Sequence, residues 1–181
     1  MRENCRGSSA PTTDCSSSRR KTMHPEIELF WKYIVSSVDH ILATMDGLEG
    51  DDLDWRPLDN ASSLAILAIH TMGNLEENLL EILCGQPVHR QRDAEFAARG
   101  TTVEALRQRW QDLQARIIAA LESVPPIELD RERDHPRRGR LSGRAVLMVA
   151  ARHAAEHMGH AALTRDLLLA AQGKTRPPSQ Y

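Results

Sequence analysis

The chain has 181 residues, of which 41% are hydrophobic, and its formal net charge is −2. That length suits one domain with a sizeable core, and the small charge gives no reason to expect nucleic acid or an anionic membrane as a partner. No apolar run approaches the roughly 20 residues that a membrane-spanning helix needs, so we expect a cytoplasmic protein.

Residues 1–22 are rich in Ser, Thr and Arg and show no apolar periodicity. They lack the apolar core of a secretory signal, so we interpret them as a disordered tail or as the product of a start codon placed upstream of Met23. We therefore expect one folded domain over residues 23–175, followed by a short tail over residues 176–181.

The first predicted helix spans residues 25–45, and the second spans residues 61–84. Proline at the first helical position and acidic residues in the first turn favour the start of the first helix. Its apolar residues recur every three or four positions and form a single stripe of Ile27, Trp31, Ile34, Val38, Ile41 and Met45. In the second helix, Asn60 is expected to cap the start and Gly85 to end the last turn.

The third predicted helix begins at Thr101, which has capping-box spacing with Glu104, and a pair of prolines ends it at Pro125. Its seam consists of Val103, Leu106, Trp110, Leu113, Ile117 and Leu121. The fourth predicted helix spans residues 142–172, and nothing in the chain reads as a strand. Four helices of about 20–30 residues, each with one apolar face, predict an all-α protein built as a four-helix bundle.

Two connections are longer than such a bundle usually needs. Residues 46–60 are acidic, and residues 125–141 carry a dense run of charges of both signs. We expect the second connection to be a solvated loop. The alternative is that some of its arginines bind an anionic substrate: Arg137, Arg138 and Arg140.

Three cysteines, an odd number, do not make a disulfide framework. Cys5 and Cys15 lie in the N-terminal tail, and Cys84 lies near the end of the second predicted helix. We expect Cys84 to be a small apolar filler and not a nucleophile, because a buried thiol is usually inert.

The fourth predicted helix carries three histidines, His153, His157 and His160, spaced four and three residues apart. At about 100° per residue, the three side chains share an arc of roughly 60°. The same arc holds five further residues, most of them apolar: Val146, Val149, Ala150, Thr164 and Leu167. We therefore expect the histidines to point toward the core.

Three buried imidazoles need partners for six ring nitrogens, which is costly without a shared acceptor or a metal. Hydrogen-bonded core histidines are the alternative, and we favour the metal site. A complete site needs a third ligand from a facing helix, and the candidate is His70, midway along the second helix after an apolar run. Asn74 and Glu77 share the helix face of His70 and could orient a ring or a bound water.

Three neutral nitrogen ligands suit Zn²⁺, Ni²⁺ or Fe²⁺, and of these we expect Zn²⁺ first. No cysteine thiolate is placed to complete a closed structural site. Three protein ligands leave at least one coordination position open, which is the pattern of catalytic sites.

Several short motifs occur together in an order that resembles the DinB/YfiT-like superfamily of bacterial metalloproteins. They are Trp55-Arg56-Pro57, the stretch from Asn60 to Ser63, the mid-helix His70, and the run HAAEHMGHAALTRDL. The resemblance spans residues 25–172.

The resemblance implies an often dimeric, up-and-down four-helix bundle in which His70, His153 and His157 bind a divalent metal. His160 stands where many family members have glutamine, so we place it beside the metal and not on it. The characterised branches conjugate or isomerise small molecules with bacillithiol, mycothiol or glutathione. The implied function is therefore a metal-dependent thiol S-transferase or isomerase that acts on small electrophiles as a homodimer.

Two other functions remain open from the sequence. One is a metal-dependent hydrolase or isomerase that uses a bound water and no thiol. The other is a non-catalytic, stress-related dimer that binds the metal without turning over a substrate.

Overall fold

The computed structural model describes residues 22–174, so the predicted tails over residues 1–22 and 176–181 lie outside it, apart from residue 22. Helices dominate the described residues, as predicted. In chain order the elements are α1 (Pro25–Ala43), α2 (Asp51–Asp54), α3 (Leu64–Leu75), the π-helical continuation η1 (Glu76–Leu83), α4 (Arg92–Ala97), α5 (Val103–Leu121), the 3₁₀ turn η2 (Pro126–Leu129), β1 (Glu132–His135), β2 (Gly139–Ser142) and α6 (Gly143–Ala171).

The expectation that the chain contains no strand was wrong. β1 and β2 pair antiparallel, with Glu132 opposite Ser142 and His135 opposite Gly139. The turn between them needs glycine because Gly139 has a φ of +71°. Most of the hairpin is exposed and charged, so it lacks the apolar alternation by which a half-buried strand is read from a sequence.

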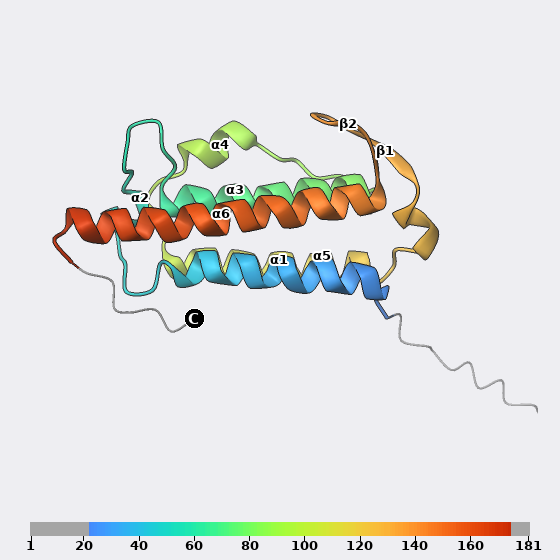
Figure 1. Ribbon diagram of the computed structural model, residues 1–181, viewed down its shortest axis with the longest axis horizontal. Coiled ribbons are helices and arrows are strands. Elements are labelled where there is room, and N and C mark those ends of the chain that lie inside the picture. The colour runs from blue at the N-terminus through green and yellow to red at the C-terminus, as the bar shows by residue number, and fades with distance from the viewer. Residues whose placement is uncertain (1–21, 175–181) are drawn as a thin grey trace, which may run out of the picture.

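Four long helical segments lie side by side: α1, α3 with η1, α5 and α6 (Figure 1). α6 runs parallel to α1, because Arg144 near its start contacts Glu26 and Arg165 near its end contacts the Asp46 carbonyl, at 2.8 and 3.1 Å. α3 and α5 both begin at the end of the molecule where α1 stops (Figure 1).

α3 and α5 therefore run parallel to each other, which differs from the strict alternation expected of an up-and-down bundle. The chain between them, residues 84–102, has to return along the whole length of α3, and it carries α4 on the way (Figure 1). Among the described residues, no helix is long and apolar enough to cross a membrane.

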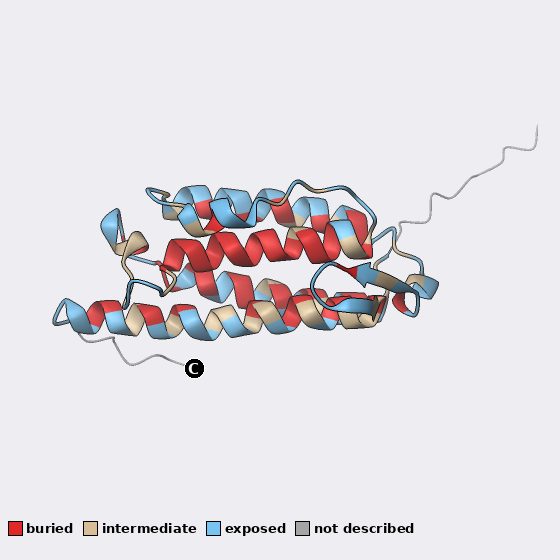
Figure 2. Cartoon of the chain, turned by 90° about the horizontal axis from the view of Figure 1, so that it is seen from above, coloured by how far each residue is buried: buried red, intermediate tan, exposed pale blue. Residues whose placement is uncertain are grey.

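α3 is buried on all sides, and each of its 12 residues counts as buried. α1, α5 and α6 contact it, and the short helix α4 contacts it as well. Figure 2 shows this helix as a nearly continuous buried segment, whereas the other long helices alternate between buried and exposed residues. A helix that is apolar all round is stable only when it is enclosed in this way.

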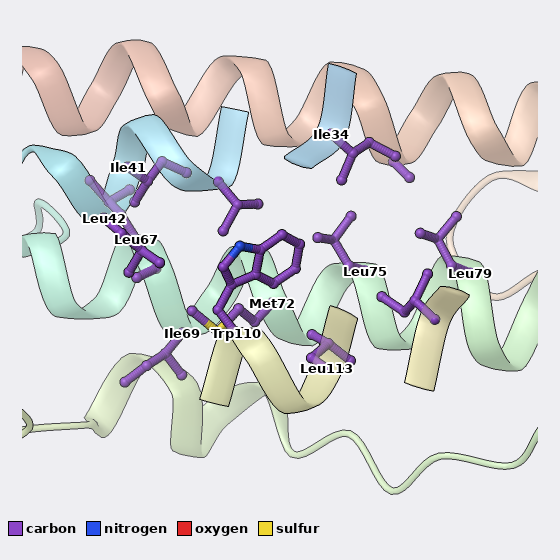
Figure 3. Packing of buried hydrophobic residues seen from close by; sticks show 14 of the residues in the cluster. Ile34, Ile41, Leu42, Leu67, Ile69, Met72, Leu75, Leu79, Trp110 and Leu113 are labelled. Carbon is purple, nitrogen blue, oxygen red and sulfur yellow. The ribbon is translucent and has the colours of Figure 1, made fainter. Parts of the chain in front are cut away.

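The predicted apolar stripes of α1 and α5 are confirmed as core. Trp110 lies among aliphatic side chains of the neighbouring helices, including Leu67 and Met72 (Figure 3). Its ring centroid is 5.9 Å from that of Trp31, and its indole N–H donates to Asp39 at 2.8 Å. This donation satisfies the polar atom of a side chain that is only 2% exposed.

The predicted start of the first helix matches that of α1, and the other three predicted starts differ from the observed ones by one to three residues. α3 is capped by Ser63 and not by Asn60, since the Ser63 hydroxyl accepts the Ile66 N–H at 3.3 Å. α5 is capped by Thr102 and not by Thr101. Neighbouring Ser, Thr and Asn residues are all good caps, and the turn that packs best decides between them.

Replacing the α3 cap tests this assignment. Ser63→Ala should lower the free energy of unfolding by about 1 kcal/mol, because it leaves a buried helix N–H without its acceptor. Asn60→Ala should change it by less than about 0.5 kcal/mol, as expected for an exposed site that caps no helix. Urea unfolding followed by circular dichroism measures both, and an equal or larger loss in Asn60→Ala would contradict the assignment.

Candidate metal centre

His70 projects from the middle of α3 and is 8% exposed. It faces α6, which packs directly against α3. The apolar residues before it, from Leu64 to Ile69, are all buried. The polar ring of His70 therefore lies in the interior, because α3, the helix that carries it, is enclosed by its neighbours.

His153 and His157 lie one turn apart on α6 and are half-buried. The Nε2 atom of His153 is 3.2 Å from Nε2 of His70 and 3.2 Å from Nε2 of His157. One ring nitrogen from each of the three residues lies within 4.8 Å of the other two. The three predicted ligands are thus brought together by two helices, and their nitrogens face a common point.

This arrangement fits a small divalent cation. Two nitrogens bound tetrahedrally to Zn²⁺ at about 2.1 Å lie about 3.4 Å apart, close to the two separations between His153 and its neighbours. Without a cation, neighbouring imidazole nitrogens at this distance can pair only where one carries a proton and the other does not. His70, His153 and His157 are therefore the residues that could hold a metal.

The electrostatics of the α6 histidines suit ligation. Burial, with smaller contributions from His157 and His70, lowers the pKa of His153 to about 2. Burial, together with His70 and His160, lowers the pKa of His157 to about 4. Both rings are neutral at pH 7, which is the protonation state that a metal requires.

A buried carboxylate that sequence reasoning missed contacts His70. Glu95, on α4, accepts a hydrogen bond from Nδ1 of His70 at 2.8 Å. Arg90, on the connection before α4, donates from Nε and Nη2 to the two oxygens of Glu95, both at 2.8 Å. Burial alone would raise the pKa of Glu95, but the hydrogen bonds from His70 and Arg90 outweigh it and hold that pKa below its usual value. No spacing in the sequence indicates this contact.

Asn74 and Glu77, predicted to orient a ring or a bound water, make no direct hydrogen bond to a ligand histidine among the described residues. Glu77 binds Arg90 and Arg137 and so reaches His70 only through Arg90. The Asn74 side chain accepts from Asn78 at 3.2 Å. In the described residues, the carboxylate that contacts a ligand histidine is thus that of Glu95 and not that of Glu77.

The expectation that the whole predicted arc of α6 points toward the core was wrong for His160 and Leu167. His160 is exposed, with Nδ1 at 3.3 Å from Nδ1 of His157, so it lies beside the three-histidine cluster. Leu167 is 41% exposed, against the expectation that it points into the core. Thr164 and Leu168 nearby are buried, so the end of the helix is not the cause. The buried face of α6 is centred on Ala154 and Ala161, and the predicted arc lies at the edge of that face.

Two of the three arginines considered as ligands of an anionic substrate pair with carboxylates, Arg137 and Arg140. Arg137 pairs with the buried Glu77, and Arg140 lies 3.2 Å from Glu132 on the neighbouring strand. For Glu77, burial raises the pKa, but the hydrogen bond from Arg137 and the charge of Arg90 outweigh it, so its pKa is lowered. Arg137 thus has a structural partner, which weakens the alternative that it binds an anionic substrate.

Phe96 belongs to the surroundings of His70, whereas Cys84 is the residue that follows η1. Phe96, on α4, packs its ring against His70 at a centroid distance of 4.7 Å, and the guanidinium of Arg92 lies 4.8 Å from the Phe96 ring centroid. Burial, partly offset by Arg133, raises the pKa of Cys84 to about 11. Cys84 is therefore protonated at pH 7, as expected of an unreactive thiol.

The chain is similar to known proteins in its sequence and in its fold. A family model described as the DinB superfamily matches residues 34–161, which is well over half of the chain. A DinB-like protein from Bacillus cereus is 17% identical, with a TM-score of 0.61 over 85% of this chain and 97% of that one. YjoA, a DinB-like protein from Bacillus subtilis, is 20% identical, with a TM-score of 0.52 over 83% of this chain and 96% of that one.

A conserved protein from Enterococcus faecalis is 16% identical, with a TM-score of 0.56 over 79% of this chain and 96% of that one. At these identities the three crystal structures show a shared fold only. No curated protein sequence matches the chain.

The lowered histidine pKa values predict how the metal-free protein responds to acid. In the unfolded chain, His153 and His157 take up protons below about pH 6.5. In the folded protein their pKa values are about 2 and about 4, so they take up protons only at lower pH. Stability should therefore fall as pH drops from 6.5 toward 4, by about 1.4 kcal/mol per pH unit for each histidine at most. Urea unfolding in the presence of a chelator measures this slope. His153→Leu should make it shallower, and an unchanged slope would contradict the prediction.

Proposed function

Because the chain belongs to the DinB superfamily, we propose that it is a metalloprotein in which His70, His153 and His157 bind one divalent cation. The observation that supports the proposal is the convergence of three imidazole nitrogens from α3 and α6. We also infer that the four long helices form the four-helix bundle of this family. Zn²⁺ is the expected metal because the nitrogen separations suit tetrahedral coordination, with Ni²⁺ and Fe²⁺ as alternatives.

The residues divide the work of holding the cation. His70 supplies a ligand from the most enclosed helix, and its Nδ1 atom is hydrogen-bonded to Glu95. His153 and His157 supply two ligands from one turn of α6, and both stay neutral at pH 7. Because the α6 histidines are only half-buried, a small molecule can approach the cluster from the solvent side.

We propose that the reaction is the transfer of a low-molecular-weight thiol to a small electrophile, or a thiol-dependent isomerisation, as the family resemblance implies. A divalent cation with an open position lowers the pKa of a thiol that binds it. In the transfer, sulfur forms a bond to the electrophilic carbon, the leaving group departs with its electron pair, and the thiol proton passes to solvent. We further propose a homodimer, which the same resemblance implies.

Elemental analysis tests the metal site. The wild-type protein should carry one equivalent of divalent metal. His70→Ala, His153→Ala and His157→Ala should each weaken binding by more than about 100-fold, since losing a ligand costs more than the roughly 10–100-fold of an outer-shell change. Competition with a chromogenic chelator measures the affinity.

His160→Ala is the matched control because it removes a neighbouring imidazole that we place beside the metal. It should retain one equivalent of metal. Wild-type protein with far less than one equivalent, and no further loss in His153→Ala, would refute the metal site.

The thiol proposal is tested with metal-loaded protein and a fluorogenic electrophile such as monochlorobimane. At least one of bacillithiol, mycothiol and glutathione should react faster than the uncatalysed background, and His153→Ala should abolish the excess rate. A background rate with every thiol would refute the transferase and leave the metal site standing. Turnover of ester or amide substrates in thiol-free buffer would instead favour the hydrolase.

A further inference from the structure

We propose that Glu95 is a positioning residue that fixes His70 as an Nε2 ligand, and that Gly73 provides the space in which it does so. The inference rests on the proposed metal site and adds to it the residues that decide how one ligand is presented. None of the sequence motifs includes either residue in this role.

The proton on His70 is determined by its surroundings. A carboxylate only accepts hydrogen bonds, so the 2.8 Å contact between Glu95 Oε2 and His70 Nδ1 requires a proton on Nδ1. Arg90 Nη2 also lies 3.3 Å from that nitrogen, but a guanidinium only donates, and it shares Oε2 with the ring. Nε2 of His70 is therefore left with its lone pair, facing the other two histidines.

His70 differs in this from the α6 histidines. Nδ1 of His153 is buried and has no hydrogen-bond partner among the described residues. Within residues 22–174, the side-chain partner of Nδ1 of His157 is the exposed ring of His160. Hydrogen bonding to a carboxylate sets the tautomer of a ligand histidine and raises its basicity, so His70 is the ligand whose presentation the protein controls.

Glu95 is itself held firmly. Its side chain is 7% exposed, and each of its oxygens receives a hydrogen bond from the buried guanidinium of Arg90. Arg90 in turn is 6% exposed and also pairs with Glu77 at 2.9 Å. The carboxylate thus cannot swing to solvent without breaking a paired charge inside the protein.

Gly73 allows the carboxylate to lie against α3. A Cβ atom placed on Gly73 would stand 2.0 Å from Oε1 and 2.8 Å from Cδ of Glu95. Gly73 follows His70 by three residues and so lies on the same side of the helix. The clash would be with the oxygen that accepts from Arg90 Nε, and that nitrogen would itself be 3.3 Å from the new Cβ. Gly73→Ala should therefore shift the carboxylate at the cost of its ion pair, and so disturb its contact with His70.

Glu77 offers a matched control. It is a second buried carboxylate, 10% exposed, that pairs with the same guanidinium of Arg90. No described hydrogen bond joins it to a histidine. Glu77→Gln therefore removes a comparable buried charge and disturbs the same arginine, but it leaves the contact between Glu95 and His70 in place.

The test compares wild type, Glu95→Gln, Gly73→Ala and Glu77→Gln as purified full-length chains. Zn²⁺ affinity, measured by chelator competition, should fall roughly 10–100-fold in Glu95→Gln and Gly73→Ala, and by less than about threefold in Glu77→Gln. In the metal-free proteins, the ¹⁵N chemical shifts of His70 should report the Nδ1–H tautomer in wild type and Glu77→Gln. The other two variants should lose it.

Equal losses of affinity in Glu95→Gln and Glu77→Gln, with the His70 tautomer unchanged, would overturn the proposal. If Glu95→Gln does not fold, as judged by circular dichroism, Gly73→Ala decides by the same two measurements. A wild-type protein that binds no Zn²⁺ would refute the metal site alone, because the tautomer of His70 in the metal-free protein still tests the role of Glu95.

Discussion

The structure depends on the complete enclosure of α3. A helix buried on every side has to have each of its polar groups satisfied inside the protein. Three long helices cover part of its surface, and the connection that returns along it brings α4 over the remaining side. The parallel course of α3 and α5 and the cover from α4 go together, since both depend on the connection that returns along α3.

The same enclosure shapes the site. His70 is the polar ring of the buried helix, and its two nitrogens are approached from opposite sides by Glu95 of α4 and by His153 of α6. A buried ion pair such as Arg90 with Glu95 rarely stabilises a fold more than apolar packing would. Its presence here is better explained by the hydrogen bond that Glu95 accepts from His70. Through this bond, α4 contacts a ring of the candidate metal centre.

Prediction from the sequence succeeded where a helix has one buried face. The stripes from Ile27 to Met45 and from Leu106 to Leu121 were read correctly because a 3.6-residue period reports such a face directly. It failed for the hairpin of β1 and β2, whose charged, mostly exposed residues carry no period. It also misjudged Leu167, because the arc drawn through the histidines lies at the edge of the buried face of α6 and not at its centre.

The sequence by itself determined that the domain is helical, and it picked out His70, His153 and His157 as candidate ligands. Helical spacing is local, so a pair four residues apart and a histidine in the middle of an apolar run can be recognised without a fold. Only the tertiary structure decided that one ring nitrogen from each of the three histidines lies close to the others, and that Glu95 accepts a hydrogen bond from His70. Glu95 lies 25 residues beyond His70, and their contact depends on the path of the connection across α3, which no residue spacing encodes.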